Sequence, residues 1–156
     1  MRKTLGFLLL SAGTIVSGSC DKAPAPPPFK PVVDVKLLMA GLVDPSAELI
    51  WENSGTIVES TGVVERKPKD DEEWTNVRNR AMMVAEAGNL LMMAPRAKDT
   101  GDWMKYSQEM IDTGTAAMRA AEAKDVEKLF ATGGQLYQAC SDCHRNYIEE
   151  IKNANK

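Results

Sequence analysis

One short segment of the chain carries residue types at a spacing that can do chemistry: residues 140–144 read Cys-Ser-Asp-Cys-His. Two thiols three positions apart on a helical turn can add to the two vinyl groups of one haem, and the neighbouring imidazole then lies under the iron. This spacing is the signature of haem-c attachment. We therefore predict that Cys140 and Cys143 form thioethers to one haem c, and that His144 is an axial ligand of its iron.

Three other interpretations of the segment fit less well. A thioredoxin-type pair stands at the start of a helix in a βαβ unit, whereas this pair lies deep in a helical pattern. A zinc site needs about four ligands, but the chain has three cysteines and one histidine, and Cys20 is separated from the others by a Pro-rich stretch. A simple disulfide would not require a histidine. His144, the only histidine of the chain, stands where the haem interpretation needs it.

The motif belongs to a predicted final helix. Apolar residues recur there at the three-and-four spacing of one helical face, and Asp125 is a suitable N-cap. We place His144 about ten residues before the end of this helix. The predicted inner face consists of Val126, Leu129, Phe130, Gly133, Leu136, Tyr137, Cys140, Cys143, His144, Tyr147, Ile148 and Ile151.

The same periodicity predicts three earlier helices. The first begins near residue 32 and is kinked or restarted at the Asp-Pro pair 44–45. The second begins near residue 70 and is ended by Pro95, and the third begins after the Thr-Gly pair 100–101. Their predicted inner faces consist of Val35, Leu38, Met39, Leu42, Ala47, Ile50 and Trp51, then Trp74, Val77, Ala81, Val84, Gly88, Leu91 and Met92, then Trp103, Ser107, Met110, Gly114, Ala117 and Ala121.

Residues 55–69 break this periodicity. Two short β-prone runs, at 56–58 and 63–64, are each preceded by a glycine. We expect a long ordered connection here, which could hold a small hairpin. Four helices, three of them joined by short connections, predict an all-α fold, an antiparallel four-helix bundle.

The N-terminus predicts export. Arg2 and Lys3 precede an apolar run at residues 5–16, which is too short to span a bilayer and has the length of a signal h-region. We therefore predict a signal peptide at residues 1–19, a Pro-rich linker at 20–31 and one domain at 32–156.

Cys20 has two interpretations. The preceding Ser-Gly-Ser resembles the lipobox of bacterial lipoproteins, although a serine stands at position 17 where a large aliphatic residue is usual. The other interpretation is ordinary signal cleavage that leaves a free thiol. The Pro-rich segment after Cys20 favours the lipid anchor, because an extended spacer suits a domain held off a membrane.

The charge of the chain argues against a nucleic-acid partner. The formal net charge is −3, and loss of Arg2 and Lys3 with the signal peptide would make it −5, with 17 basic against 22 acidic side chains. No second apolar run is long enough for a transmembrane helix.

An exported four-helix chain with this motif in its last helix resembles the class II c-type cytochromes, the cytochrome c′ group. The resemblance covers roughly residues 32–156. Tyr147 matches an aromatic residue that often follows the family's motif, whereas Ile148 stands where a basic residue is usual and only Arg145 supplies nearby charge. Residues 39–45 and the insert at 55–69 depart from cytochrome c′ itself, which suggests a divergent subgroup.

The resemblance implies two alternatives for the sixth iron ligand. Some class II cytochromes carry a methionine from the first helix and transfer electrons; cytochrome c′ leaves the position open and binds nitric oxide or carbon monoxide. Met39 lies about seven residues into the first helix, or roughly 10 Å, and His144 lies roughly 15 Å from the end of an antiparallel last helix. We therefore predict Met39 as the sixth ligand of an electron-transfer cytochrome, with the open gas-binding site as the alternative.

The remaining expectations follow from this prediction. We expect a non-enzymatic, periplasmic protein, since apart from the haem site no catalytic constellation is evident. Redox proteins would be its partners, a lipidated Cys20 could tether it to a membrane, and homodimerisation is known in the family. Arg78 and Arg80 could pair with the haem propionates or simply form a solvated face.

Overall fold

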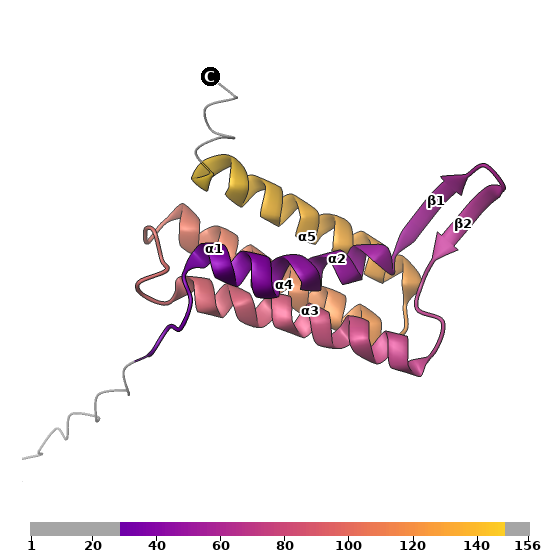
Figure 1. The fold of residues 1–156 in the computed structure, drawn as a ribbon, viewed down its shortest axis with the longest axis horizontal. Helices are drawn as coiled ribbons and strands as arrows, with labels where there is room; N and C mark the ends of the chain where they lie inside the picture. The colour runs from indigo at the N-terminus through magenta and orange to yellow at the C-terminus, as the bar shows by residue number, and fades with distance from the viewer. Residues whose placement is uncertain (1–28, 149–156) are drawn as a thin grey trace, which may run out of the picture.

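The computed structural model describes residues 29–148, and these are mostly helical (Figure 1). The predicted signal peptide, Cys20, most of the linker and Ile151 lie outside the described residues. The elements in chain order are α1 (Val35–Leu38), the π-helical turn η1 (Met39–Val43), α2 (Asp44–Glu52), β1 (Gly55–Glu59), β2 (Gly62–Arg66), α3 (Asp71–Met92), α4 (Asp102–Glu122) and α5 (Val126–Tyr147).

The helices form a bundle in which consecutive units run in opposite directions (Figure 1). The elements α1, η1 and α2 follow one another as one bent unit, which we call the N-terminal rod (residues 35–52). Its α2 contacts α3 and α5, and α4 likewise contacts α3 and α5. The mostly helical character predicted from the sequence is therefore confirmed. Within residues 29–148, no helix is long and apolar enough to cross a bilayer.

Aspartates begin three of the helical units. The Asp34 carboxylate accepts a hydrogen bond from the backbone N–H of Leu37, and Asp70 does the same for Glu73. Asp125 accepts from the N–H of Lys128 at 3.0 Å, so the predicted N-cap of α5 is confirmed. Each cap satisfies a backbone donor that the helix itself leaves free, which is typically worth about 1 kcal/mol.

The rod is interrupted where the sequence predicts a kink. Pro45 has no N–H to donate to the carbonyl of residue 41, so the regular ladder cannot continue through it. The preceding turn is π-helical, and the N–H of Asp44 donates to the carbonyl of Met39. Single π turns inside helices are frequent at functional sites.

Helices α3 and α4 approach each other closely through glycine. A Cβ atom on Gly114 would lie 2.8 Å from the backbone nitrogen of Ala85, and one on Gly88 would lie 2.7 Å from the carbonyl oxygen of Ser107. Only hydrogen at these positions allows the two backbones to come so near. The predicted inner face of the third helix is confirmed in full, because Trp103, Ser107, Met110, Gly114, Ala117 and Ala121 are all buried.

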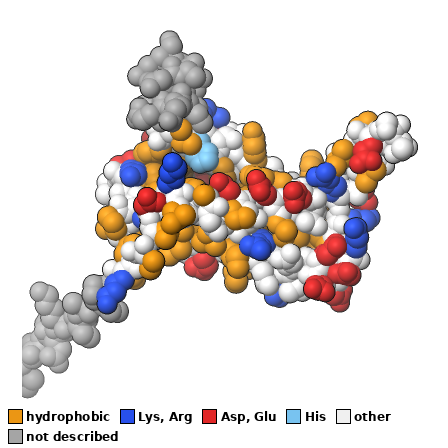
Figure 2. Space-filling model, in the orientation of Figure 1, with side chains coloured by type: hydrophobic (Ala, Val, Ile, Leu, Met, Phe, Trp, Pro, Cys, Tyr) orange, Lys and Arg blue, Asp and Glu red, His pale blue; other side chains and the backbone are white. Residues whose placement is uncertain are grey.

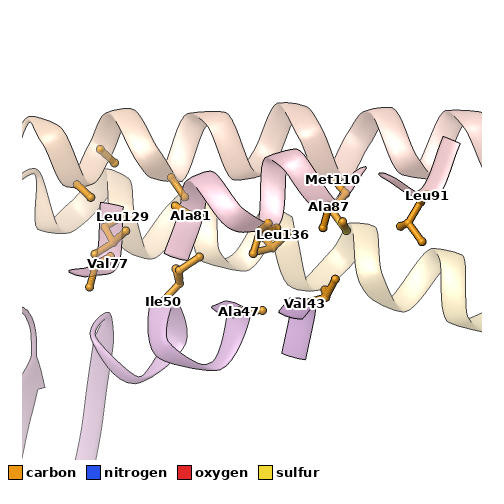
Figure 3. Packing of buried hydrophobic residues seen from close by; sticks show 14 of the residues in the cluster. Val43, Ala47, Ile50, Val77, Ala81, Ala87, Leu91, Met110, Leu129 and Leu136 are labelled. Carbon is orange, nitrogen blue, oxygen red and sulfur yellow. The ribbon is translucent and has the colours of Figure 1, made fainter. Parts of the chain in front are cut away.

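The hydrophobic core joins all four helical units. Figure 3 shows side chains of the rod and of α5 meeting those of α3 and α4. The labelled core residues are Val43, Ala47, Ile50, Val77, Ala81, Ala87, Leu91, Met110, Leu129 and Leu136.

Two expectations for the last helix are wrong. The helix ends at Tyr147, because Ile148 is already extended, so His144 lies three residues before the end and not ten. Phe130 and Tyr137 are 60% and 63% exposed, although we predicted them on the inner face. They border the buried stripe: Tyr137 meets Trp51 edge-on and Phe130 lies next to Gly55, but these contacts leave most of each ring exposed.

The connection between the rod and α3 contains a hairpin. Strands β1 and β2 pair antiparallel, with Ile57 opposite Val64 and Val58 opposite Val63. The hairpin projects from one end of the bundle (Figure 1) and leaves Val58 and Val63 exposed. The two β-prone runs therefore do pair, and the helices contact one another without involving the hairpin.

Candidate functional site

The Cys-x-x-Cys-His segment lies on the last two turns of α5 and faces a cavity. Cys140, Cys143 and His144 all line this inner cavity, which has a volume of about 390 Å³. Neither cysteine forms a disulfide, and both are partly buried. The structure thus brings all three predicted attachment residues to one space.

Most of the other inner-cavity walls are apolar or aromatic and come from the remaining helical units. The rod contributes Met39, Val43 and Ala47, and α3 contributes Leu91. From α4 come Trp103, Tyr106, Ser107 and Met110. An apolar space beside the motif suits the flat body of a porphyrin.

A second cavity, which we call the outer cavity, adjoins the first at the open end of the site. Its volume is about 850 Å³. It extends past the end of α5 and past the start of the rod. The two cavities share the lining residues Met39, Asp44, Trp103, Cys143 and His144.

Met39 lines the same cavities as His144, although part of the argument for its position was wrong. Both helices are shorter at this end than we expected: α5 ends three residues after His144, and the rod begins four residues before Met39. At 1.5 Å per residue, these separations are both about 5 Å. The error was about seven residues on α5 and about three on the rod, and the two separations now differ by only one residue, so the two side chains lie at nearly the same level. Met39 and His144 consequently line both cavities.

One other methionine reaches the same space. Met110 of α4 is buried and lines the inner cavity. Met92 lines neither cavity, and the same holds for Met82, Met83, Met93, Met104 and Met118. Met39 and Met110 are therefore the two methionines that a ligand in the inner cavity would meet.

The thiols are held in their protonated form. Burial raises the pKa of Cys140 to about 11, and the carboxylate of Asp44 adds to the rise. Burial likewise raises the pKa of Cys143 to about 11, with a smaller effect from Cys140. Reactive dithiol pairs have lowered pKa values that favour the thiolate, so the electrostatics are unlike those of a thioredoxin-type pair.

Within residues 29–148, no three His, Cys, Asp or Glu side chains are grouped as a metal held by protein ligands alone would need. A haem iron does not require such a group, because the porphyrin supplies four of its ligands. The donor set that the site does offer, one imidazole with a thioether across the cavity, is that of a Met/His haem.

Two tryptophans in the wall of the inner cavity donate hydrogen bonds that join neighbouring helices. The indole N–H of Trp51 donates to the carbonyl of Gly133 at 2.9 Å and joins the rod to α5. The indole N–H of Trp103 donates to the carbonyl of Leu91 at 2.9 Å and joins α4 to α3. Trp51 and Trp103 line the inner cavity, whereas Trp74 is buried and lines neither cavity.

Tyr147 secures the end of α5. Its ring stacks edge-on against Trp103, with 5.0 Å between centroids, and its hydroxyl donates to the carboxylate of Asp99. Burial and this hydrogen bond raise the pKa of Tyr147 to about 12. The hydrogen bond from Tyr147 is also the main cause that holds the pKa of Asp99 below its usual value.

The lysines near the cavities are residues for which the sequence predicted no role. Arg78 and Arg80 line neither cavity. Lys36 of α1 and Lys98 of the α3–α4 connection line the outer cavity instead. Arg145 lines the inner one and is paired with Asp142. The helical pattern gave no signal for Lys36 or Lys98, because only the folded chain brings these two segments together.

Comparisons of the chain with protein-family models, with curated proteins and with solved structures found no match. The resemblance to the class II c-type cytochromes therefore stays a prediction. It rests on the motif, on the position of the motif in the last helix and on the helical fold.

Proposed function

We propose that this chain is an exported c-type cytochrome that transfers electrons. One haem c would be held by thioethers to Cys140 and Cys143, with His144 and Met39 as axial ligands. The observation that carries the proposal is that Cys140, Cys143 and His144 on α5 line the inner cavity together with Met39 on the rod.

The space beside the motif fits this cofactor. A haem has an apolar ring and two carboxylates; the inner cavity is mostly apolar, and the outer cavity carries charged side chains. When bound, the haem supplies a one-electron couple, and a Met/His ligand set raises its potential. The walls from α3 and α4 would exclude water from the ring, and the two cysteines would keep the ring joined to the chain.

The protein itself contributes orientation. The Trp51–Gly133 hydrogen bond fixes the rod against α5, and Tyr147 fixes the end of α5 against the α3–α4 connection. These contacts position His144 and Met39 on opposite walls. Such a rigid site suits electron transfer, in which the ligands move little between redox states.

The proposed location is the periplasm, with a lipid tether through Cys20. The support is the sequence of residues 1–28, which precede the described part of the chain. The wild-type protein should fractionate with membranes, and Cys20→Ser should be released or misprocessed. A soluble wild-type protein would refute the tether and leave the cytochrome proposal unaffected.

The axial ligands are tested by optical spectra of the haem-loaded protein. We expect a low-spin reduced spectrum with a sharp α band, and a weak sulfur-to-iron band in the far red when the protein is oxidised. Met39→Ala should abolish that band, lower the midpoint potential and open the iron to carbon monoxide.

Met110→Ala is the matched control, because Met110 lines the same cavity, and Met92→Ala is the remote control. Both should leave the spectrum unchanged. A wild-type protein that is already high-spin and binds carbon monoxide readily would contradict Met39 ligation and favour the gas-binding alternative. Loss of the far-red band in Met110→Ala alone would move the ligand to α4.

A further inference from the structure

The outer cavity carries two lysines from segments far apart in the sequence. Lys36 lies on α1, and Lys98 lies in the connection between α3 and α4. Both side chains are exposed, and neither takes part in an ion pair among the described residues. They are the only Lys or Arg side chains that line this cavity within the described part of the chain.

The acidic groups around the same cavity do not neutralise these lysines. The Asp34 carboxylate accepts the Leu37 N–H at 2.8 Å and caps α1. Asp44 also lines the cavity, and its carboxylate forms no ion pair among the described residues. Among residues 29–148, no carboxylate forms an ion pair with either ammonium group, and both groups are exposed to an anion that enters from the solvent side.

The two cavities together match a ligand with an apolar body and two negative charges at one edge. The inner cavity is mostly apolar, and the outer cavity, which shares Met39, Cys143 and His144 with it, carries both lysines. A carboxylate that approaches a protein surface is stabilised by a flexible ammonium group, which can follow it on its four-carbon stem.

We propose that Lys36 and Lys98 bind the two propionates of the haem. This inference rests on the proposed function, since it requires a haem in the inner cavity. Lys36 also stands three residues before Met39 on the rod, so the two side chains lie on one helical face. A propionate held by Lys36 would therefore help to hold Met39 at the haem, which makes Lys36 a positioning residue.

The proposal has a measurable electrostatic consequence. A positive charge near the iron disfavours the ferric state, which carries one more positive charge than the ferrous state. Replacing either lysine by a neutral residue should therefore lower the midpoint potential. It should also weaken the hydrogen bonding of one propionate, which resonance Raman spectra report through the propionate bending bands.

The test compares Lys36→Gln, Lys98→Gln and the double variant with Lys69→Gln. Lys69 is exposed, precedes α3 and lines neither cavity, so it is a matched control. Each variant is first checked for covalent haem by mass. Absence of covalent haem from the wild type would refute the proposed function, which is a different outcome from failure of this inference.

We expect each single variant to lower the potential and shift one propionate band, and the double variant to do both to a greater extent. Lys36→Arg and Lys98→Arg should restore wild-type values, because they keep the charge. Lys69→Gln should change neither quantity. A double variant that holds covalent haem with wild-type propionate bands and potential would overturn the proposal.

Discussion

Helices α3 and α4 meet backbone to backbone, whereas the rod and α5 face each other across two cavities. On the first side, hydrogen atoms at Gly88 and Gly114 allow contacts that a Cβ atom would prevent. On the second side, Trp51 reaches from the rod to the carbonyl of Gly133 in α5. Figure 2 shows the histidine at the surface of the molecule.

The difference shows how one bundle combines stability with a binding space. Small residues let two helices close on each other and supply a rigid pair. Between the rod and α5, large aromatic side chains hold the two units apart and leave room beside residues 140–144. The spaces of about 390 and 850 Å³ therefore lie on the side of the bundle that carries Cys140, Cys143 and His144.

We call the contact between α3 and α4 the tight side and the region between the rod and α5 the open side. The largest expected effect comes from adding a side chain to the tight side. Gly114→Leu would force a side chain against the backbone of Ala85, and we expect a loss of about 3 kcal/mol or more in the free energy of unfolding. The matched variant is Gly134→Ala on α5, where a Cβ atom meets nothing within 4 Å. It should stabilise the protein by about 0.5–1 kcal/mol. Urea unfolding of the haem-loaded protein measures both, and equal effects would show that the two sides pack alike.

Replacing Trp51 or Trp103 should have a smaller effect on the free energy of unfolding. Trp51→Phe removes the hydrogen bond to Gly133, and we expect a loss of about 1 kcal/mol. Trp103→Phe leaves the Leu91 carbonyl without its donor inside the core, so it should cost more, about 1–3 kcal/mol. Thermal unfolding would compare the two. A larger loss for Trp51 would mean that the open side contributes more to stability than the tight side.

The smallest expected effect concerns pH. The Tyr147 hydroxyl holds the pKa of Asp99 below its usual value of 3.8, so this contact stabilises the fold above that pH and is lost as pH falls through the lowered value. Tyr147→Phe should make the loss of stability in acid smaller, because the pKa of Asp99 in the folded protein returns toward 3.8, whereas the pH at which the loss begins is set by the unfolded chain and stays the same. Asp102→Asn, which keeps the Tyr147 hydroxyl, is the control. Identical acid profiles for Tyr147→Phe and the wild type would show that this contact does not contribute to stability in acid.

The sequence predicted the tight side better than the open side. On α4 every residue that the three-and-four spacing placed on the inner face is buried, and the spacing missed only Ala120. On α5 the same rule placed Phe130 and Tyr137 inside, although both are exposed. Periodicity identifies the side of a helix that is apolar, but it does not show how far the neighbouring helices extend over it.

The candidate site was predictable in its chemistry and less so in its surroundings. The spacing of residues 140–144 identified the attachment segment, and chain direction in an antiparallel bundle brought Met39 to the same level. Lys36 and Lys98 could not be found in this way, since Lys98 belongs to no helical pattern. The sequence indicated the hairpin only as a possibility. Its facing residues Val58 and Val63 are exposed, so packing against the helices does not explain why the two strands pair.

The central claim is that Cys140 and Cys143 hold a haem covalently, and one measurement tests it most directly. The protein is produced together with a haem-c maturation system, denatured, extracted with acid-acetone and weighed by mass spectrometry. We expect the mass of the apoprotein plus one haem, and no added mass in the variant that carries Cys140→Ser and Cys143→Ser. Recovery of free haem in the extract, with the wild-type protein at its apoprotein mass, would contradict the account.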